Sequence, residues 1–133
     1  MALILVIDDV ATMRDLVRRM LERAEHSVIE AEDGEVGIAV VEMQGPALVI
    51  TDLIMPKKEG IETIQQIRRS HPNTKIIAMS GHVQSDGASY LDAARKLGAD
   101  AILAKPFVGA ALLDVVDRLL NVVCVGHARS ATG

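Results

Sequence analysis

The sequence predicts an α/β protein built on a doubly wound, five-stranded parallel sheet. Two observations support this prediction. Short apolar runs occur at intervals along the chain, and each is followed by a stretch whose apolar residues recur with a helical period of about 3.6 residues. Regular alternation of strands and helices is typical of a parallel sheet that is covered by helices on both faces and joined by right-handed crossovers. We therefore expect a (βα)5 order and a three-layer αβα sandwich.

The apolar runs are the expected strands. All but the second, which is weaker, are rich in Ile, Val or Leu with little polar alternation, as in strands that are buried on both faces. The runs cover residues 3–7, 27–30, 47–51, 75–79 and 100–104.

A helix is expected after each strand, because apolar residues spaced three and four apart lie on one helical face. In chain order the sets are Met13, Leu16, Val17, Met20, Leu21 and Ala24; Val36, Ala39, Val40 and Met43; Ile61, Ile64 and Ile67; Leu91, Ala94 and Leu97; and Val108, Ala111, Leu112, Val115, Val116 and Leu119. Residues that start or stop helices agree with these positions. They are Asp33-Gly34 and Gly45-Pro46 around the second helix, Pro72 after the third, Gly98 after the fourth and Pro106 before the last.

The composition indicates one folded domain. The 133 residues are 50% hydrophobic and 24% charged, and this length suits a single hydrophobic core. We expect the domain to cover residues 1–125. Residues 126–133 are mostly small or polar and are expected to form a flexible C-terminal tail.

Charge and composition also exclude several classes of function. A net charge of −4 leaves no basic stripe for direct binding of nucleic acid. The apolar run at residues 1–7 is too short to span a membrane or to form a signal peptide. The single cysteine, Cys124, permits no internal disulfide, which fits a cytoplasmic protein.

Polar residues follow the expected strands at the edge where ligands bind in open α/β sheets. Asp8 and Asp9 follow the first strand, Asp52 the third, Ser80 the fourth and Lys105 the fifth. Taken singly, each has an ordinary interpretation as a helix cap, a turn residue or a solvated charge. Their coincidence at one edge favours a site.

Three converging carboxylates must share protons, bind a cation or pair with Lys105. Hard oxygen ligands suit Mg²⁺, which keeps several waters and favours phosphate oxygens. An aspartate can also act as a nucleophile and form an aspartyl phosphate, with a metal, a lysine and a hydroxyl stabilising the transferred group. The sequence therefore predicts Mg²⁺-dependent phosphoryl chemistry at this edge.

Four segments, in order and spacing, resemble the receiver domain of two-component response regulators. They read VIDDVATMR, ITDLIMPKKEGIE, IIAMSGH and GADAILAKPF, and the resemblance covers essentially the whole chain. It implies a flavodoxin-like fold with the strand order 2-1-3-4-5.

The resemblance also implies roles for the residues of the site. Asp52 matches the phosphoacceptor, and Asp8, Asp9 and Asp52, with the backbone carbonyl of Ile54, match the ligands of Mg²⁺, which Mn²⁺ can replace. Ser80 and Lys105 match the hydroxyl and the ammonium that contact the phosphoryl group. The phosphoryl donor would be a histidine kinase or a histidine phosphotransfer protein.

The implied output is a conformational signal, so the chain is expected to be a signalling receiver rather than an enzyme with a separate substrate. It would catalyse its own phosphorylation and, more slowly, its own dephosphorylation. The signal would reach a downstream effector through the face formed by the fourth helix, the fifth strand and the fifth helix. We expect a single-domain protein that acts on another protein, as a monomer or as a phosphorylation-dependent dimer.

Three positions bear on switching and tuning. Ile102 stands three residues before Lys105, where the family usually has Tyr or Phe, so the aromatic part of the usual switch is absent and Ile102 either changes the output or fills the same groove. Ile54, two residues after Asp52, is expected to shield the acyl phosphate and slow its hydrolysis. His82, two residues after Ser80, is interpreted as a solvated loop residue rather than a catalytic one.

Three other interpretations compete. A phosphohydrolase of the haloacid dehalogenase type would need a second aspartate where Ile54 stands, and a cap domain. A flavin-binding protein would need more aromatic residues than Tyr90 and Phe107, and Asp8-Asp9 would repel its phosphate. A receiver that serves only as a fixed binding surface would not need Asp52, Ser80 and Lys105 together.

Overall fold

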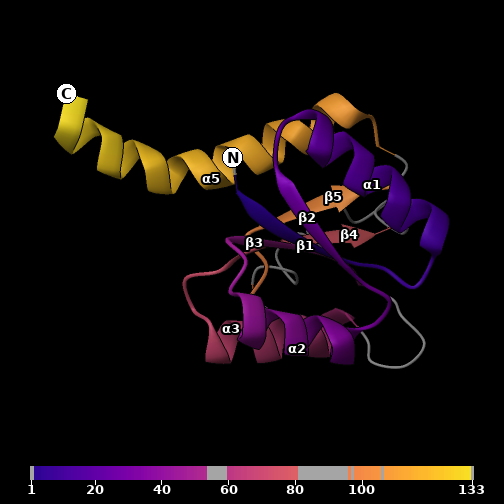
Figure 1. Cartoon of the computed structure of the whole chain (residues 1–133). Coiled ribbons are helices and arrows are strands. Elements are labelled where there is room, and N and C mark those ends of the chain that lie inside the picture. Colours follow the sequence, from indigo (N-terminus) through magenta and orange to yellow (C-terminus); the bar gives the residue numbers. More distant parts are fainter. Residues whose placement is uncertain (1, 54–59, 81–95, 97, 106, 133) are drawn as a thin grey trace.

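The computed structural model describes residues 2–53, 60–80, 96, 98–105 and 107–132, with residues 121–132 described as backbone only. Its centre is a parallel sheet of five strands in the order β2-β1-β3-β4-β5. This confirms the predicted fold class and strand order (Figure 1). The strands are β1 (Leu3–Ile7), β2 (Ser27–Ala31), β3 (Leu48–Asp52), β4 (Lys75–Ser80) and β5 (Ala101–Ala104).

Helices cover both faces of the sheet, as Figure 1 shows, with α1 and α5 on one side and α2 and α3 on the other. They are α1 (Ala11–Arg23), α2 (Gly34–Gln44), α3 (Gly60–Ser70) and α5 (Gly109–Thr132). The expected fourth helix, with Leu91, Ala94 and Leu97, lies outside the described residues, as does Pro106. None of the described helices has both the length and the apolar composition that are needed to cross a bilayer.

The core lies in two layers, one on each face of the sheet. In β1, Ile4 and Val6 pack against α1 and α5, whereas Leu5 and Ile7 pack toward α2 and α3, and all four are fully buried. Successive side chains of a strand point to opposite faces, so a strand between two helical layers must be apolar at every position. Burial of each such side chain contributes about 1.5–3 kcal/mol, which explains the unbroken apolar runs.

Two of the helix signals in the sequence have their expected geometry. The Asp33 carboxylate caps α2 by accepting a hydrogen bond from the Val36 amide at 2.9 Å, and Gly45 ends that helix in the left-handed conformation with φ 59°. α1 begins differently, because Val10 occupies its N-cap position and no side chain accepts a capping hydrogen bond there. Asp9 is therefore not the helix cap.

The last helix is longer than the sequence indicates. α5 continues to Thr132, so residues 126–132 are helical, and Figure 1 shows this end of α5 projecting beyond the sheet. The flexibility expected for residues 126–133 stays a prediction.

Arg68, on α3, forms hydrogen bonds with residues 72–74 and 98–100 at the edge of the sheet opposite the polar strand ends. Its guanidinium donates to the carbonyl oxygens of Gly98 (2.7 Å from Nη2), Pro72 (2.7 Å) and Thr74 (2.9 Å), and to the Asp100 carboxylate (2.6 Å). We expect Arg68→Met to lower the free energy of unfolding by about 2–3 kcal/mol, because these acceptors lose a charged donor. Urea denaturation measures the loss.

The neighbouring Arg69 provides the control for this prediction, because it is exposed on the same helix. Arg69→Met should change the free energy of unfolding by less than about 0.5 kcal/mol. Equal losses in the two variants would contradict the role assigned to Arg68.

Candidate functional site

The polar residues at the carboxyl ends of the strands meet at one edge of the sheet. Asp8, Asp9 and Asp52 each offer a carboxylate oxygen, and these oxygens lie within 4.8 Å of one another. The Lys105 Nζ lies 3.1 Å from the Asp52 Oδ2 and 3.5 Å from the Asp8 Oδ2. Parallel strands bring residues together in this way because their carboxyl ends share one edge.

Asp8 is fully buried, and both its backbone amide and its carboxylate form hydrogen bonds. Its amide donates to the Ala31 carbonyl at 3.1 Å, and its Oδ1 accepts from the Val10 amide at 2.9 Å. Burial raises the pKa of the Asp8 carboxyl above its ordinary value, and the nearby Asp52 charge adds to this, while the Val10 amide and Lys105 oppose it.

The three carboxylates repel one another strongly when all are ionised. Even at 4.8 Å, the upper limit of these separations, the repulsion within each pair is about 3.5 kcal/mol at an effective dielectric constant of 20. Three carboxylates and the one Lys105 ammonium leave a formal charge of −2. A divalent cation with a preference for hard oxygen ligands matches both the charge and the donor atoms, so the residues fit Mg²⁺.

Ser80 and Lys105 are placed by backbone pairing of β4 with β5. Ser80 is 1% exposed at the end of β4 and stands opposite Ala104. Its carbonyl accepts a hydrogen bond from the Lys105 amide at 2.7 Å. The stem of Lys105 is thereby fixed next to β4, and its ammonium reaches across to Asp52 and Asp8.

Of the three positions expected to bear on switching and tuning, the structure describes Ile102. Ile102 stands opposite Ala78 in the sheet and packs, partly buried, against the core beneath α2 and α3. The role of Ile102 in the switch stays a prediction. Ile54 and His82 lie outside the described residues.

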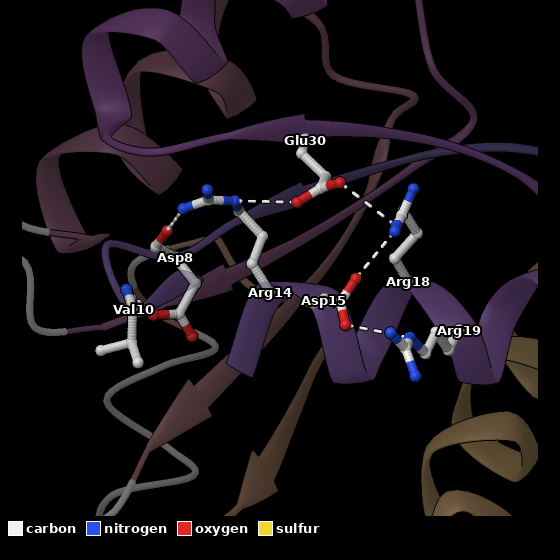
Figure 2. A network of polar contacts seen from close by, with 7 residues as sticks. All are labelled: Asp8, Val10, Arg14, Asp15, Arg18, Arg19 and Glu30. Atoms are coloured by element: carbon white, nitrogen blue, oxygen red, sulfur yellow. Dashed lines mark hydrogen bonds and ion pairs between the residues drawn. The ribbon is translucent and has the colours of Figure 1, made fainter. Parts of the chain in front are cut away.

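Arg14 is a site neighbour that the sequence did not single out. Its Nη1 donates to the Asp8 carbonyl oxygen at 2.7 Å, and its Nε donates to the Glu30 carboxylate at 3.0 Å (Figure 2). An arginine on the polar face of a predicted helix has no sequence signal that distinguishes such a contact from a solvated charge.

Comparison with known proteins agrees with this geometry. Residues 4–117 match the family described as the response regulator receiver domain. The chain is 31% identical over 118 residues to the chemotaxis protein CheY of Halobacterium salinarum. The aligned residues are 89% of this chain and 96% of that protein. It is 33% identical over 115 residues to the transcriptional regulatory protein DegU of Brevibacillus brevis, and here it spans 48% of the relative's length.

Solved structures show the same likeness. A receiver domain protein from Clostridium thermocellum superposes with a TM-score of 0.85 at 28% identity, covering 94% of this chain and 98% of that one. The chemotaxis protein CheY4 of Vibrio cholerae superposes with a TM-score of 0.81 at 26% identity, over 90% of this chain and 98% of its own. The fold, the acidic edge and the match over residues 4–117 lead to one conclusion: the chain belongs to the response regulator receiver domain family, a family of signalling domains.

Proposed function

We propose that this receiver accepts a phosphoryl group on Asp52 in a Mg²⁺-dependent reaction. The donor would be the phosphohistidine of a histidine kinase or of a histidine phosphotransfer protein. The proposal rests on the close approach of the side chains of Asp8, Asp9, Asp52 and Lys105 at one edge of the sheet. The relatives that match are response regulators, which favours this function over a phosphohydrolase or a flavin protein.

In the proposed reaction an Asp52 carboxylate oxygen attacks phosphorus in line with the histidine nitrogen. The new O–P bond forms as the N–P bond breaks, and the imidazole leaves with that electron pair. Asp8, Asp9 and Asp52, together with the carbonyl of Ile54, would hold Mg²⁺, or Mn²⁺ in its place. The ion would neutralise charge on the phosphoryl oxygens.

Lys105 and Ser80 would receive the transferred group. The Lys105 ammonium already pairs with the Asp52 carboxylate at 3.1 Å and can follow the charge onto a phosphoryl oxygen. The Ser80 hydroxyl would donate to another phosphoryl oxygen. Because Ser80 ends β4 and its carbonyl binds the Lys105 amide, its movement would be transmitted to β5.

We further propose that the signal leaves through β5, α5 and the predicted fourth helix to a downstream effector protein in the cytoplasm. The chain would act without binding nucleic acid directly, as a monomer or as a phosphorylation-dependent dimer. Slow loss of the phosphoryl group by hydrolysis would end the signal, and Ile54 is the position proposed to slow that loss.

Incubation with acetyl phosphate and Mg²⁺, followed by intact-mass spectrometry, tests the proposal. We expect one phosphoryl adduct on the wild-type protein and none on Asp52→Asn or in the presence of a chelator. Asp33→Asn is the matched control, because Asp33 also follows a strand but caps α2, and asparagine caps equally well. Adduct formation by Asp52→Asn, or none by the wild type, would contradict the proposal.

A further inference from the structure

We infer that Arg14, anchored by Glu30, is a positioning residue that holds Asp8 in place at the acidic edge. The inference rests on the proposed function, because it assigns a role in Mg²⁺ binding. It concerns two residues that lie on α1 and on β2, away from the reacting atoms.

Asp8 is the first residue after β1, so the ladder with β3, whose last pair is Ile7 with Thr51, does not hold it. Instead, both of its backbone polar groups are tied to β2. Its amide donates to the Ala31 carbonyl at 3.1 Å. Its carbonyl accepts from Arg14, whose Nε is bound to Glu30, the residue directly before Ala31 (Figure 2).

These contacts oppose a force that acts on Asp8. The carboxylates of Asp8, Asp9 and Asp52 lie close enough to repel one another. Without an external restraint, the short segment after β1 would relax by moving Asp8 away from Asp52. The Arg14 hydrogen bond, at 2.7 Å and from a charged donor, restrains the carbonyl of the same residue.

Position rather than charge is what Arg14 contributes. Its guanidinium is oriented by Glu30, which it shares with Arg18, whose Nε lies 3.2 Å from the second carboxylate oxygen. Arg14 uses two different nitrogens for its two partners, one toward Glu30 and one toward Asp8. A lysine has one nitrogen on a flexible stem and cannot reproduce this fork.

The test compares Arg14→Gln and Arg14→Lys with Arg18→Gln in the full chain. Arg18 shares Glu30 and also pairs with Asp15 at 2.7 Å, so its loss disturbs the same network at a point that does not bind the Asp8 carbonyl. The first readout needs no metal. It is the hydrogen-exchange rate of the Val10 amide, which donates to the Asp8 carboxylate. The second is Mg²⁺ affinity measured by titration calorimetry.

We expect both Arg14 variants to show faster exchange at Val10 and about tenfold weaker Mg²⁺ binding, the usual effect of losing a group that orients a metal ligand. Arg18→Gln should match the wild type within about twofold in both readouts. Equal changes in the Arg14 and Arg18 variants, or full rescue by lysine, would overturn the inference.

The two proposals fail in distinguishable ways. A wild-type protein that binds no Mg²⁺ contradicts the proposed function, and exchange at Val10 then still decides whether Arg14 positions Asp8. A wild type that binds Mg²⁺ and becomes phosphorylated, with Arg14→Gln unchanged in both readouts, contradicts only the inference.

Discussion

Asp8→Asn is expected to make the metal-free protein more stable at neutral pH and to weaken Mg²⁺ binding by at least about 100-fold. Both effects come from removing the negative charge of Asp8. Asp8 is fully buried, and burial disfavours its carboxylate. Asparagine has nearly the same shape and can still accept from the Val10 amide, but it carries no charge for a metal to bind.

The pH dependence follows from the direction of the shift. The pKa of Asp8 is raised in the folded protein above its ordinary value of 3.8, mainly by burial. The folded state therefore binds this proton more tightly than the unfolded chain does. As the pH rises from 3.8 through the higher folded pKa, the free energy of unfolding falls in the wild type. Asp8→Asn should lack this loss, so its advantage should vanish below pH 3.8.

Mg²⁺ should reverse the order of stability. At a hundred times its Kd, a ligand adds about 2.7 kcal/mol to the folded state, or about 10 °C in Tm for a chain of this length. The wild type should gain this stabilisation and Asp8→Asn should not. Thermal unfolding of both proteins, with Mg²⁺ and with a chelator at neutral pH and without Mg²⁺ below pH 3.8, measures these differences.

Asp33→Asn is the matched control for this prediction. Asp33 is 8% exposed, follows β2 and accepts from a backbone amide, but it belongs to no metal-binding group among the described residues. Its Tm should change little in either condition. If Mg²⁺ raised the Tm of the wild type and of Asp8→Asn equally, Asp8 would not be a ligand of the proposed metal site.

Much of the fold was predictable because burial on both faces leaves a clear trace in the sequence. β1 spans Leu3–Ile7, the predicted range, since Asp8 ends the apolar run where the strand ends. β3 begins and ends one residue later than the predicted run, at Leu48 and Asp52, and β4 extends one residue further, to Ser80. The backbone continues to pair there, Asp52 with Met79 and Ser80 with Ala104, whatever the polarity of the side chain.

The site was predictable in part for a related reason. Parallel topology makes strand ends converge, so Asp8, Asp52 and Lys105 were found from their positions in the chain alone. Arg14 was not, because its contacts with Asp8 and Glu30 depend on how α1 lies across the sheet. α5 begins at Gly109, three residues after Pro106, and nothing in the apolar pattern, which starts at Val108, marks this position.

Gly60→Ala is expected to destabilise the fold by at least about 3 kcal/mol, one of the largest effects of a single methyl group in this chain. A β-carbon at Gly60 would overlap the Asp52 carbonyl oxygen and lie 2.6 Å from the Leu53 Cα. Both are backbone atoms and cannot rotate away. The Gly60 amide also donates to the Leu53 carbonyl at 3.0 Å, so α3 is fastened to the end of β3 at this point.

Gly109→Ala separates this steric effect from the general cost or benefit of alanine. Gly109 also begins a helix, but its added β-carbon would make only ordinary contact, 3.6 Å from the Met20 Sδ. This control should be neutral or stabilising by up to about 1 kcal/mol, because alanine has the higher helix propensity. Urea denaturation of both variants gives the comparison.

The same substitution should reach the proposed phosphorylation site. The methyl group fits only if α3 and the end of β3 move apart. Where the Asp52 carbonyl and Leu53 are pushed away from α3, the Asp52 carboxylate leaves its 3.1 Å contact with Lys105. Folded Gly60→Ala should then accept phosphoryl from acetyl phosphate at least about tenfold more slowly than Gly109→Ala, since small misplacements of reacting groups cost large factors in rate. A stable Gly60→Ala protein with a normal rate would show that the end of β3 tolerates displacement of α3, and that the close approach at Gly60 does not position Asp52.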